Sequence, residues 1–402
     1  MSEQQICHKC IGDEIVKLEI SNSEVVSKCS FCGTIGNVVK LDGIIDRIGA
    51  IIADNFNSDY EIRPQGGYLL TSVVKLIAKT PHKATTAIVD ILTNEVKIMR
   101  GALGIELLFD REVRYNETKA SNVSYFKVWP EFKASVKHLI RFFNTKAKQV
   151  LDDIFMPTEI ARVSKGSRPI ITIKANDSTY FYRGRIASDG DQIKAYLQKP
   201  RQELGPIPPM LATPGRMNPQ GISMFYLSFN KRTCVTELRP PIGSSVVIAG
   251  FKLKKDIKVL DISLLAKGIR PNSYFDPNLS AVKEKITFLS SIEAEMTRPI
   301  FPGNELLDYL PTQVIAEYLS TQFHAKLDGI VLRSAQSAGK TGKNLILFPQ
   351  IAHDYIRFTS MIGASKGGTI DPAIELDENT LSVEYITGVA YKTRTRNIRR
   401  KR

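Results

Sequence analysis

The sequence has few cysteines and lacks any long apolar segment. Five cysteines in 402 residues are too few for a scaffold of disulfide bonds. No apolar run approaches the roughly 20 residues that a membrane-spanning helix needs. The first ten residues, MSEQQICHKC, lack the apolar core of a secretory signal. We therefore expect a cytoplasmic protein with no membrane partner.

Acidic residues are scarce relative to basic ones. There are 41 Asp+Glu against 55 Lys+Arg, which gives a formal net charge of +14. Hydrophobic residues make up 43% of the chain, and this proportion argues against a disordered protein. The excess of positive charge suggests an anionic partner, either nucleic acid or a phosphorylated ligand. Seven of the positive charges lie within residues 392–402, so half of the excess belongs to a basic tail.

Four of the five cysteines form two pairs near the N-terminus, Cys7 with Cys10 and Cys29 with Cys32. Each Cys-x2-Cys turn can direct two sulfurs at one ion, and the spacing is that of a zinc ribbon or knuckle. Gly33 directly follows the last cysteine and would relieve a tight turn there. Because four thiolates close the coordination shell of Zn²⁺, we predict a structural zinc site without catalytic chemistry. The alternative is four free thiols in a reducing compartment.

The hydrophobic pattern divides the rest of the chain into a helical part and a mixed part. Residues 15–20 alternate in polarity, which predicts a short strand. Apolar residues then recur at helical spacing between 41 and 160, and their last stripe predicts one long helix over 132–154. From 170 onward, β-type runs alternate with turn residues and with helical stretches at 230–238, 278–290 and 311–323. Strands mixed with helices in this irregular order predict an α+β fold.

We therefore predict four segments. They are a zinc knuckle (1–40), a helical domain (41–160), an α+β domain (170–365) and a C-terminal extension with a basic tail (366–402).

Four segments of the α+β domain place polar residues at the edges of apolar runs. They are Tyr182-Arg183-Gly184-Arg185, the glycine-bounded segment 215–222, the strand and helix over 225–238, and the segment 328–334. Together they offer arginines, a hydroxyl-bearing aromatic ring, a glutamate and a serine to one cleft.

In order and spacing, these motifs resemble the RES domain family over roughly residues 175–350. A Tyr-Arg strand is followed by Gly-Arg-x-Asn-x-x-Gly, by Tyr-x-Ser, by Glu237 eleven residues after the tyrosine, and by Asp-Gly-x-x-x-x-Ser. The resemblance implies an ADP-ribosyltransferase-like fold and the consumption of NAD, by a toxin that hydrolyses NAD or by an enzyme that transfers ADP-ribose to a protein. The zinc and helical front half resembles the HEPN/RES N-terminal domain.

The resemblance also implies roles for individual residues. The catalytic candidates are Glu237, Tyr226 and Arg183, and the residues expected to bind NAD are Arg183, Arg216, Asn218, Tyr226 and Ser334. A carboxylate beside the ribose can stabilise the positive charge that develops when the nicotinamide–ribose bond breaks. An arginine fork suits the pyrophosphate, and a tyrosine ring can stack on nicotinamide.

Two of these assignments leave alternatives open. Arg185 is a rival for the role of Arg183, and Arg216 is the second candidate for the pyrophosphate. Ser334 is expected to orient either a ribose hydroxyl or the carboxamide. Cys234 lies one helical turn before Glu237, and we expect it to pack rather than to act as a nucleophile.

The expected small molecules are NAD, as the substrate, and a structural Zn²⁺. The resemblance adds an antitoxin or regulatory protein, a protein target for ADP-ribose, and a role as a toxin or defence effector. We expect the helical part to be a scaffold, a sensor or the interface of a homodimer. The alternative function is nucleic-acid binding through the zinc ribbon, the basic tail and a basic helix face, with an inert C-terminal domain. That face comprises Lys133, Lys137, Arg141 and Lys148.

Overall fold

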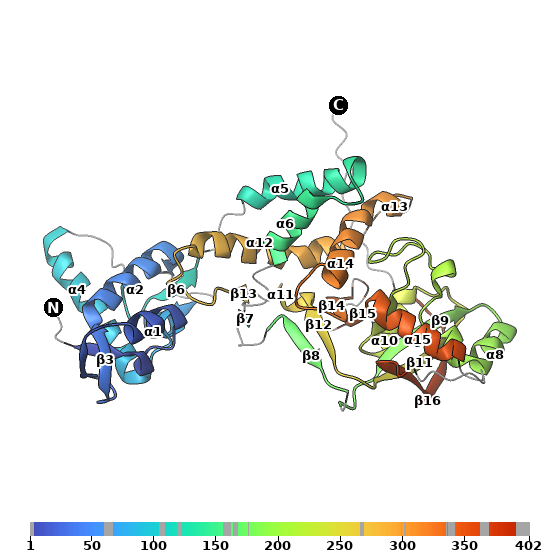
Figure 1. Ribbon diagram of the computed structural model, residues 1–402, viewed down its shortest axis with the longest axis horizontal. Helices are drawn as coiled ribbons and strands as arrows, with labels where there is room; N and C mark the ends of the chain where they lie inside the picture. Colours follow the sequence, from blue (N-terminus) through green and yellow to red (C-terminus); the bar gives the residue numbers. More distant parts are fainter. Residues whose placement is uncertain are drawn as a thin grey trace. The chain divides into compact units, whose positions relative to one another are not determined.

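The computed structural model divides the chain into two units, which Figure 1 shows with their helices and strands. The first unit consists of residues 1–122 and 270–287, and the second consists of residues 123–269 and 288–402. The structure describes residues 4–59, 67–103, 109–118, 123–155, 162–163, 168–175, 177–265, 269–298, 300, 303–334, 336, 342–361 and 370–390. The basic tail lies outside these residues.

The first unit begins with a three-stranded antiparallel sheet and one helix. The strands are β1 (Gln5–Cys7), β3 (Ile35–Lys40) and β2 (Val26–Lys28), in this spatial order, with a 3-10 turn at His8–Cys10. Residues 14–21 form helix α1 (Glu14–Ser21), so the prediction of a strand at 15–20 was wrong. The side chain of Asp13 caps this helix by accepting a hydrogen bond from the backbone N of Ile15. Val16 and Ile20, four residues apart, are its buried positions.

Three further helices of the first unit bury apolar residues at the predicted helical spacing. They are α2 (Leu41–Asn55), α3 (Leu70–Ala78) and α4 (His82–Leu103). A small sheet pairs β6 (Arg114–Glu117) with β4 (Phe56–Asp59) and β5 (Tyr68–Leu69). Three side chains from far along the chain, Tyr274, Phe275 and Leu279, belong to the same hydrophobic core.

The second unit begins with two helices where one was predicted. Helix α5 (Val123–Ala134) passes into a π-helical turn (Ser135–Leu139), and α6 (Thr145–Phe155) starts after a break. Asn144 makes the break: its Oδ1 accepts from the backbone N of Ala147 at 3.0 Å, and its Nδ2 donates to Ser135 Oγ at 2.9 Å. The prediction of one helix over 132–154 was therefore wrong. The hydrophobic pattern predicted that residues 123–155 belong to a helical domain over 41–160, whereas in the structure they are part of the second unit.

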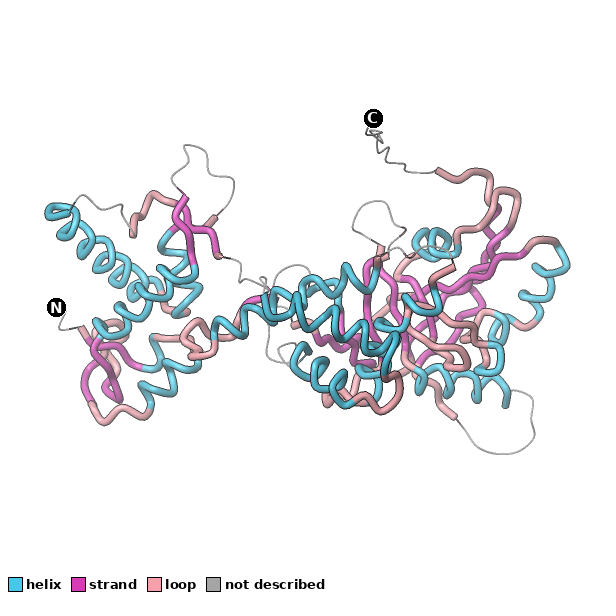
Figure 2. Tube along the Cα trace, turned by 90° about the horizontal axis from the view of Figure 1, so that it is seen from above, coloured by secondary structure: helices cyan, strands magenta, loops and turns pink. Residues whose placement is uncertain are grey.

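An eight-stranded sheet is the centre of the second unit, and Figure 2 shows its strands side by side. Its order is β16 (Ile374–Tyr385), β11 (Ser245–Leu253), β9 (Phe181–Ala187), β10 (Phe225–Ser228), β15 (Lys343–Leu347), β14 (Gly329–Arg333), β12 (Ile257–Asp261) and β8 (Ile170–Ile173). Strands β12 and β14 are parallel, and the other neighbouring pairs are antiparallel. The predicted mixture of strands and helices is confirmed.

Helices lie between the strands in the sequence. They are α8 (Gly190–Gln198), α9 (Pro200–Glu203), α10 (Lys231–Leu238), α11 (Ile262–Leu265), α12 (Leu279–Thr297), α13 (Glu305–Asp308), α14 (Leu310–Thr321) and α15 (Pro349–Met361), with a 3-10 turn at Pro209–Leu211 and two-residue strands β7 (Arg162–Val163) and β13 (Ile269–Arg270). Helix α15 buries Ala352 and Tyr355 in the core on one face of the sheet, against residues such as Phe225 and Phe251. In the part of the chain that the structure describes, no helix combines the length and the apolar character needed to cross a bilayer.

Candidate functional site

The other face of the sheet lines a cavity of about 320 Å³. Side chains alternate between the faces of a strand, so residues that pair across strands share a face. Ser228 pairs with both Tyr182 and Asn344, and Tyr226 pairs with Ile346, so these five residues lie on the cavity face. Helices α10 and α12 supply further lining. The cavity is lined by Tyr182, Arg183, Gly184, Arg216, Met217, Tyr226, Leu227, Ser228, Cys234, Glu237, Leu238, Met296, Thr297, Leu332, Arg333, Asn344 and Ile346.

Glu237 is the carboxylate of the cavity, and it lies at the end of helix α10. Asn230 fixes the start of this helix, because its side chain accepts a hydrogen bond from the backbone N of Thr233 at 2.8 Å. Glu237 Oε1 accepts hydrogen bonds from Ser334 Oγ and from Asn344 Nδ2, the latter at 2.9 Å. The structure thus brings together two predicted site residues, Glu237 and Ser334, which lie 97 positions apart.

Tyr226 joins the sheet to the glycine-bounded loop 215–221. Its hydroxyl donates to Asn218 Oδ1 at 2.6 Å and accepts from the backbone N of Met217 at 3.3 Å. Desolvation by burial raises the pKa of this hydroxyl. A Cβ at Gly215 would lie 2.5 Å from Asn218 Oδ1, so the loop requires glycine there. The hydroxyl of Tyr226 is therefore engaged in the protein, while its ring remains on the cavity face.

Asn218 organises the same loop from inside. Its side chain is 4% exposed, and its Nδ2 donates to the backbone carbonyls of Thr213, Pro219 and Ile222 at 3.0–3.1 Å. Its Oδ1 is the acceptor for Tyr226. Both ends of the amide are thus used within the protein, which favours a role in shaping the loop over direct contact with NAD.

Arg183 lies where two strands of the sheet separate. Strand β10 forms four residue pairs with β15 but only one with β9, between Ser228 and Tyr182. Beyond that pair, Arg183 Nη1 donates to the backbone carbonyl of Tyr226 at 3.3 Å. Burial, followed by the like charge of Arg185, lowers the pKa of Arg183 to about 10. No carboxylate pairs with Arg183 among the described residues, so an anionic ligand would relieve the cost of burying its charge.

Arg216 reaches the cavity from the loop, whereas Arg185 does not line it. Arg216 Nη1 donates to the carbonyls of Met296 and Arg298, at 3.1 and 2.8 Å, and its guanidinium lies 5.4 Å from the centre of the Tyr309 ring. Desolvation by burial lowers its pKa. The geometry places Arg183 and Arg216, rather than Arg185, at the cavity.

Sequence reasoning missed several polar residues of the cavity. Ser228 and Asn344 had no assigned role, although their register on neighbouring strands places them together. Arg333 Nε donates to Glu293 Oε1 at 2.8 Å, and Glu293 on α12 is only 2% exposed. The Glu293 partner raises the pKa of Arg333. Nothing in the local sequence marks this pair, because its members lie 40 positions apart.

Cys234 also lines the cavity, but its environment suppresses the thiolate. The side chain is 5% exposed, and desolvation by burial raises its pKa to about 12. A thiol needs a lowered pKa to act as a nucleophile near neutral pH. This environment supports the expectation that Cys234 packs.

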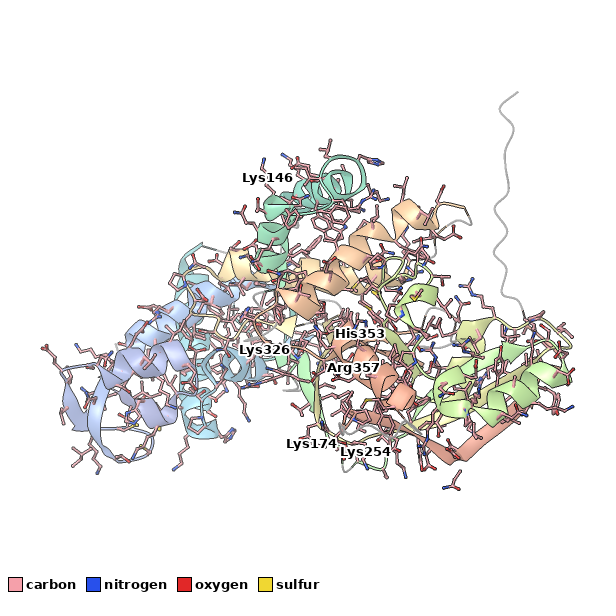
Figure 3. All side chains as sticks on the ribbon, turned by 45° about the vertical axis from the view of Figure 1, so that its right-hand side comes forward. Lys146, Lys174, Lys254, Lys326, His353 and Arg357 are labelled. Carbon is pink, nitrogen blue, oxygen red and sulfur yellow. The ribbon has the colours of Figure 1, made fainter. Side chains whose placement is uncertain are left out.

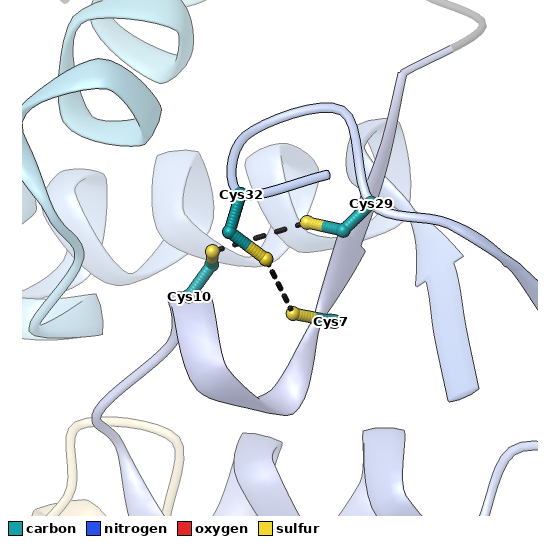
Figure 4. Close-up of side chains that lie close together, drawn as sticks. All are labelled: Cys7, Cys10, Cys29 and Cys32. Atoms are coloured by element: carbon teal, nitrogen blue, oxygen red, sulfur yellow. Dashed lines mark hydrogen bonds between the residues drawn. The ribbon is translucent and has the colours of Figure 1, made fainter. Parts of the chain in front are cut away.

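The four paired cysteines form a cluster in the first unit, shown in Figure 4. Their sulfurs all lie within 4.8 Å of one another, with Cys7 and Cys32 at 3.5 Å and Cys10 and Cys29 at 3.8 Å. Tetrahedral Zn²⁺ with Zn–S bonds of about 2.3 Å requires S···S separations of about 3.8 Å. Gly33 has φ +71°, which confirms the predicted tight turn. The donor set and its spacing therefore fit a structural metal ion, and in the described residues no other group of His, Cys, Asp or Glu does so.

Comparison with known families adds to this geometry. Residues 190–361 match the RES domain. This part of the chain is a RES domain. The match contains Arg216, Tyr226, Glu237 and Ser334, whereas Arg183 lies before its start. It indicates an enzymatic activity that uses NAD. A search of the curated proteins found no match.

Proposed function

We propose that the protein cleaves the nicotinamide–ribose bond of NAD, releases nicotinamide and passes ADP-ribose to water or to a protein. The observation that carries the proposal is the fixed carboxylate of Glu237 in a cavity that also holds two half-buried arginines, Arg183 and Arg216, without carboxylate partners among the described residues. A cavity of 320 Å³ is at the lower end of the range for ligand pockets, about 300–1,000 Å³, so it suits the nicotinamide–ribose–phosphate end of the dinucleotide and not the whole molecule.

In this proposal, each residue acts on one part of NAD. Glu237 accepts a hydrogen bond from a ribose hydroxyl and stabilises the positive charge of the oxocarbenium-like transition state. Arg183 and Arg216 provide N–H donors and positive charge for the pyrophosphate. The ring of Tyr226 is the stacking surface for nicotinamide. Ser334 acts through its hydrogen bond to Glu237, and Asn218 acts by holding the loop.

The decisive experiment incubates the full-length protein with NAD and measures free nicotinamide by chromatography. Glu237→Gln keeps the shape and removes the charge, so we expect at least a 100-fold loss of release, about 3 kcal/mol of transition-state stabilisation. Glu317→Gln, an exposed position on α14, is the matched control and should retain wild-type release. Mass spectrometry distinguishes free ADP-ribose from a modified protein. The absence of any NAD turnover, together with the absence of any ADP-ribosylated protein, would exclude the proposal.

For the cysteine cluster, we propose a structural Zn²⁺ held by Cys7, Cys10, Cys29 and Cys32. The ion would crosslink the two halves of a segment that is too short to build a large core of its own. Four thiolates leave no open position for water, so this site stabilises the first unit without taking part in the reaction.

The structure weakens the case for the alternative function, nucleic-acid binding through the basic helix face. Lys133, Lys137 and Lys148 form ion pairs with Glu295, Asp308 and Asp152, which compete with phosphate for them. Lys146 remains exposed at the surface of α6 (Figure 3). A gel shift that disappears when residues 392–402 are removed would assign any residual binding to the tail.

The antitoxin, the protein target, the homodimer, the HEPN resemblance, the cytoplasmic location and the four-segment division stay predictions. The same holds for the ADP-ribosyltransferase-like fold and the role as a toxin or defence effector.

A further inference from the structure

A chain of hydrogen bonds leads from the sheet to Glu237. Ser228 Oγ donates to Asn344 Oδ1 at 2.7 Å, and Asn344 Nδ2 donates to Glu237 Oε1 at 2.9 Å. Ser228 and Asn344 face each other directly on strands β10 and β15, and Ser228 is only 5% exposed. Two central strands of the sheet, β10 and β15, are therefore linked by hydrogen bonds to the carboxylate that lies on helix α10.

The amide of Asn344 has a donor end and an acceptor end, and its surroundings distinguish them. A carboxylate accepts hydrogen bonds only, so Glu237 requires the NH₂ group on its side. The oxygen of the amide then faces Ser228, whose hydroxyl donates to it. Turning the amide over would place its oxygen against the carboxylate, which is repulsive. Ser228 thus selects the orientation of Asn344 in which the NH₂ group donates to Glu237.

Both hydrogen bonds to Glu237, from Asn344 and from Ser334, converge on Oε1. Within the described part of the chain, no hydrogen bond to Oε2 is found. A ribose hydroxyl entering the cavity would therefore meet a carboxylate whose first oxygen is anchored and whose second is available.

We propose that Ser228 and Asn344 are positioning residues: Asn344 anchors the carboxylate of Glu237, and Ser228 fixes the orientation of the Asn344 amide. This inference rests on the proposed cleavage of NAD, because it assigns Glu237 the reacting role. Neither residue needs to touch the substrate.

The test is Asn344→Asp, which has nearly the same shape but replaces the donor with a second carboxyl group. Two carboxyl groups about 3 Å apart cannot both ionise without a large cost, so they share a proton and the apparent pKa of one rises. We expect the acidic limb of the pH–kcat profile to move upward by at least about one pH unit, and kcat at pH 7 to fall about 10- to 100-fold.

Ser228→Ala removes only the orienting hydroxyl. We expect kcat to fall about 3- to 10-fold without a new ionisation, and Ser228→Thr, which restores a hydroxyl, to recover most of the loss. Asn230→Asp is the control for Asn344→Asp: it adds the same charge at the start of α10, the helix that carries Glu237, but keeps the side-chain oxygen that caps this helix, so the pH profile should not move.

A second measurement does not depend on catalysis. In the folded Asn344→Asp variant, the shared proton raises the pKa of the carboxyl pair above its value in the unfolded chain. The contribution of the carboxyl pair to stability is then fully present at low pH and is lost as pH rises, so the melting temperature of the variant should fall relative to wild type from about pH 4 up to the raised pKa and stay lower above it. If wild type releases no nicotinamide, the proposed function fails, while this measurement still tests the contact. The positioning role is overturned if the melting temperature of Asn344→Asp depends on pH as that of wild type does. It is also overturned if the variant is active and its pH–kcat profile is not shifted.

Discussion

Removing one oxygen atom from Tyr226 should destabilise the second unit far more than the usual conservative change. In Tyr226→Phe, the Oδ1 of Asn218 and the backbone N–H of Met217 lose their hydroxyl partner. Both residues are buried, at 4% and 0% exposure, so water does not readily replace it. Each unsatisfied group costs about 1–3 kcal/mol, and the longer contact to Met217 should lie at the low end, giving about 2–4 kcal/mol in total. For a unit of this size, the melting temperature should fall by about 4–16 °C.

Calorimetry of the full-length protein measures this loss, and the neighbouring strand offers a control. Tyr182 lies on the same cavity face, and no hydrogen bond of its hydroxyl is found among the described residues, so Tyr182→Phe should change stability by less than about 0.5 kcal/mol. A melting temperature within 1 °C of wild type for Tyr226→Phe would refute the reasoning. Because the ring is retained, nicotinamide release below the melting temperature should fall by less than about tenfold if Tyr226 acts by stacking.

Two other predictions concern cysteines. Cys29→Ser removes one of four thiolates, so bound zinc, measured by elemental mass spectrometry, should fall from one ion per chain to a small fraction. The first unit should also melt at a lower temperature. Full zinc retention would exclude the four-cysteine site. Cys234, with its pKa of about 12, should be thiolate in only about one molecule in 10,000 at pH 8, so iodoacetamide should leave its peptide unlabelled in the folded protein and label it after unfolding. Rapid labelling of the folded protein would contradict the burial that raises its pKa.

The sequence predicted the elements whose apolar pattern is long or rich in β-branched and aromatic residues. Strands at 170–173, 225–228 and 245–248 formed where expected, as did helices beginning near 41 and 70. The motif order also located the RES domain and placed Glu237 and Ser334 at one site.

Short segments and distant pairings could not be predicted in the same way. The apolar residues of 14–21 fit both the alternation of a strand and the i, i+4 spacing of a helix. The hydrogen bond from the backbone N of Ile15 to the Asp13 side chain caps the segment and favours the helix. The break at Asn144 depends on hydrogen bonds that lie across two helices. The partners of Glu237 and Arg333 come from distant positions: strand register brings Asn344 beside the cavity, and the packing of helix α12 brings Glu293 to Arg333.

The discontinuous first unit has a consequence for the order in which the protein can mature during synthesis. Its core includes Tyr274, Phe275 and Leu279, which leave the ribosome well after residue 122. Ser334 and Asn344, which hold Glu237, are translated later still. A growing chain therefore possesses all the residues of the first unit before it possesses those that complete the carboxylate site. No nascent chain has an assembled site while part of the first unit is still to be made.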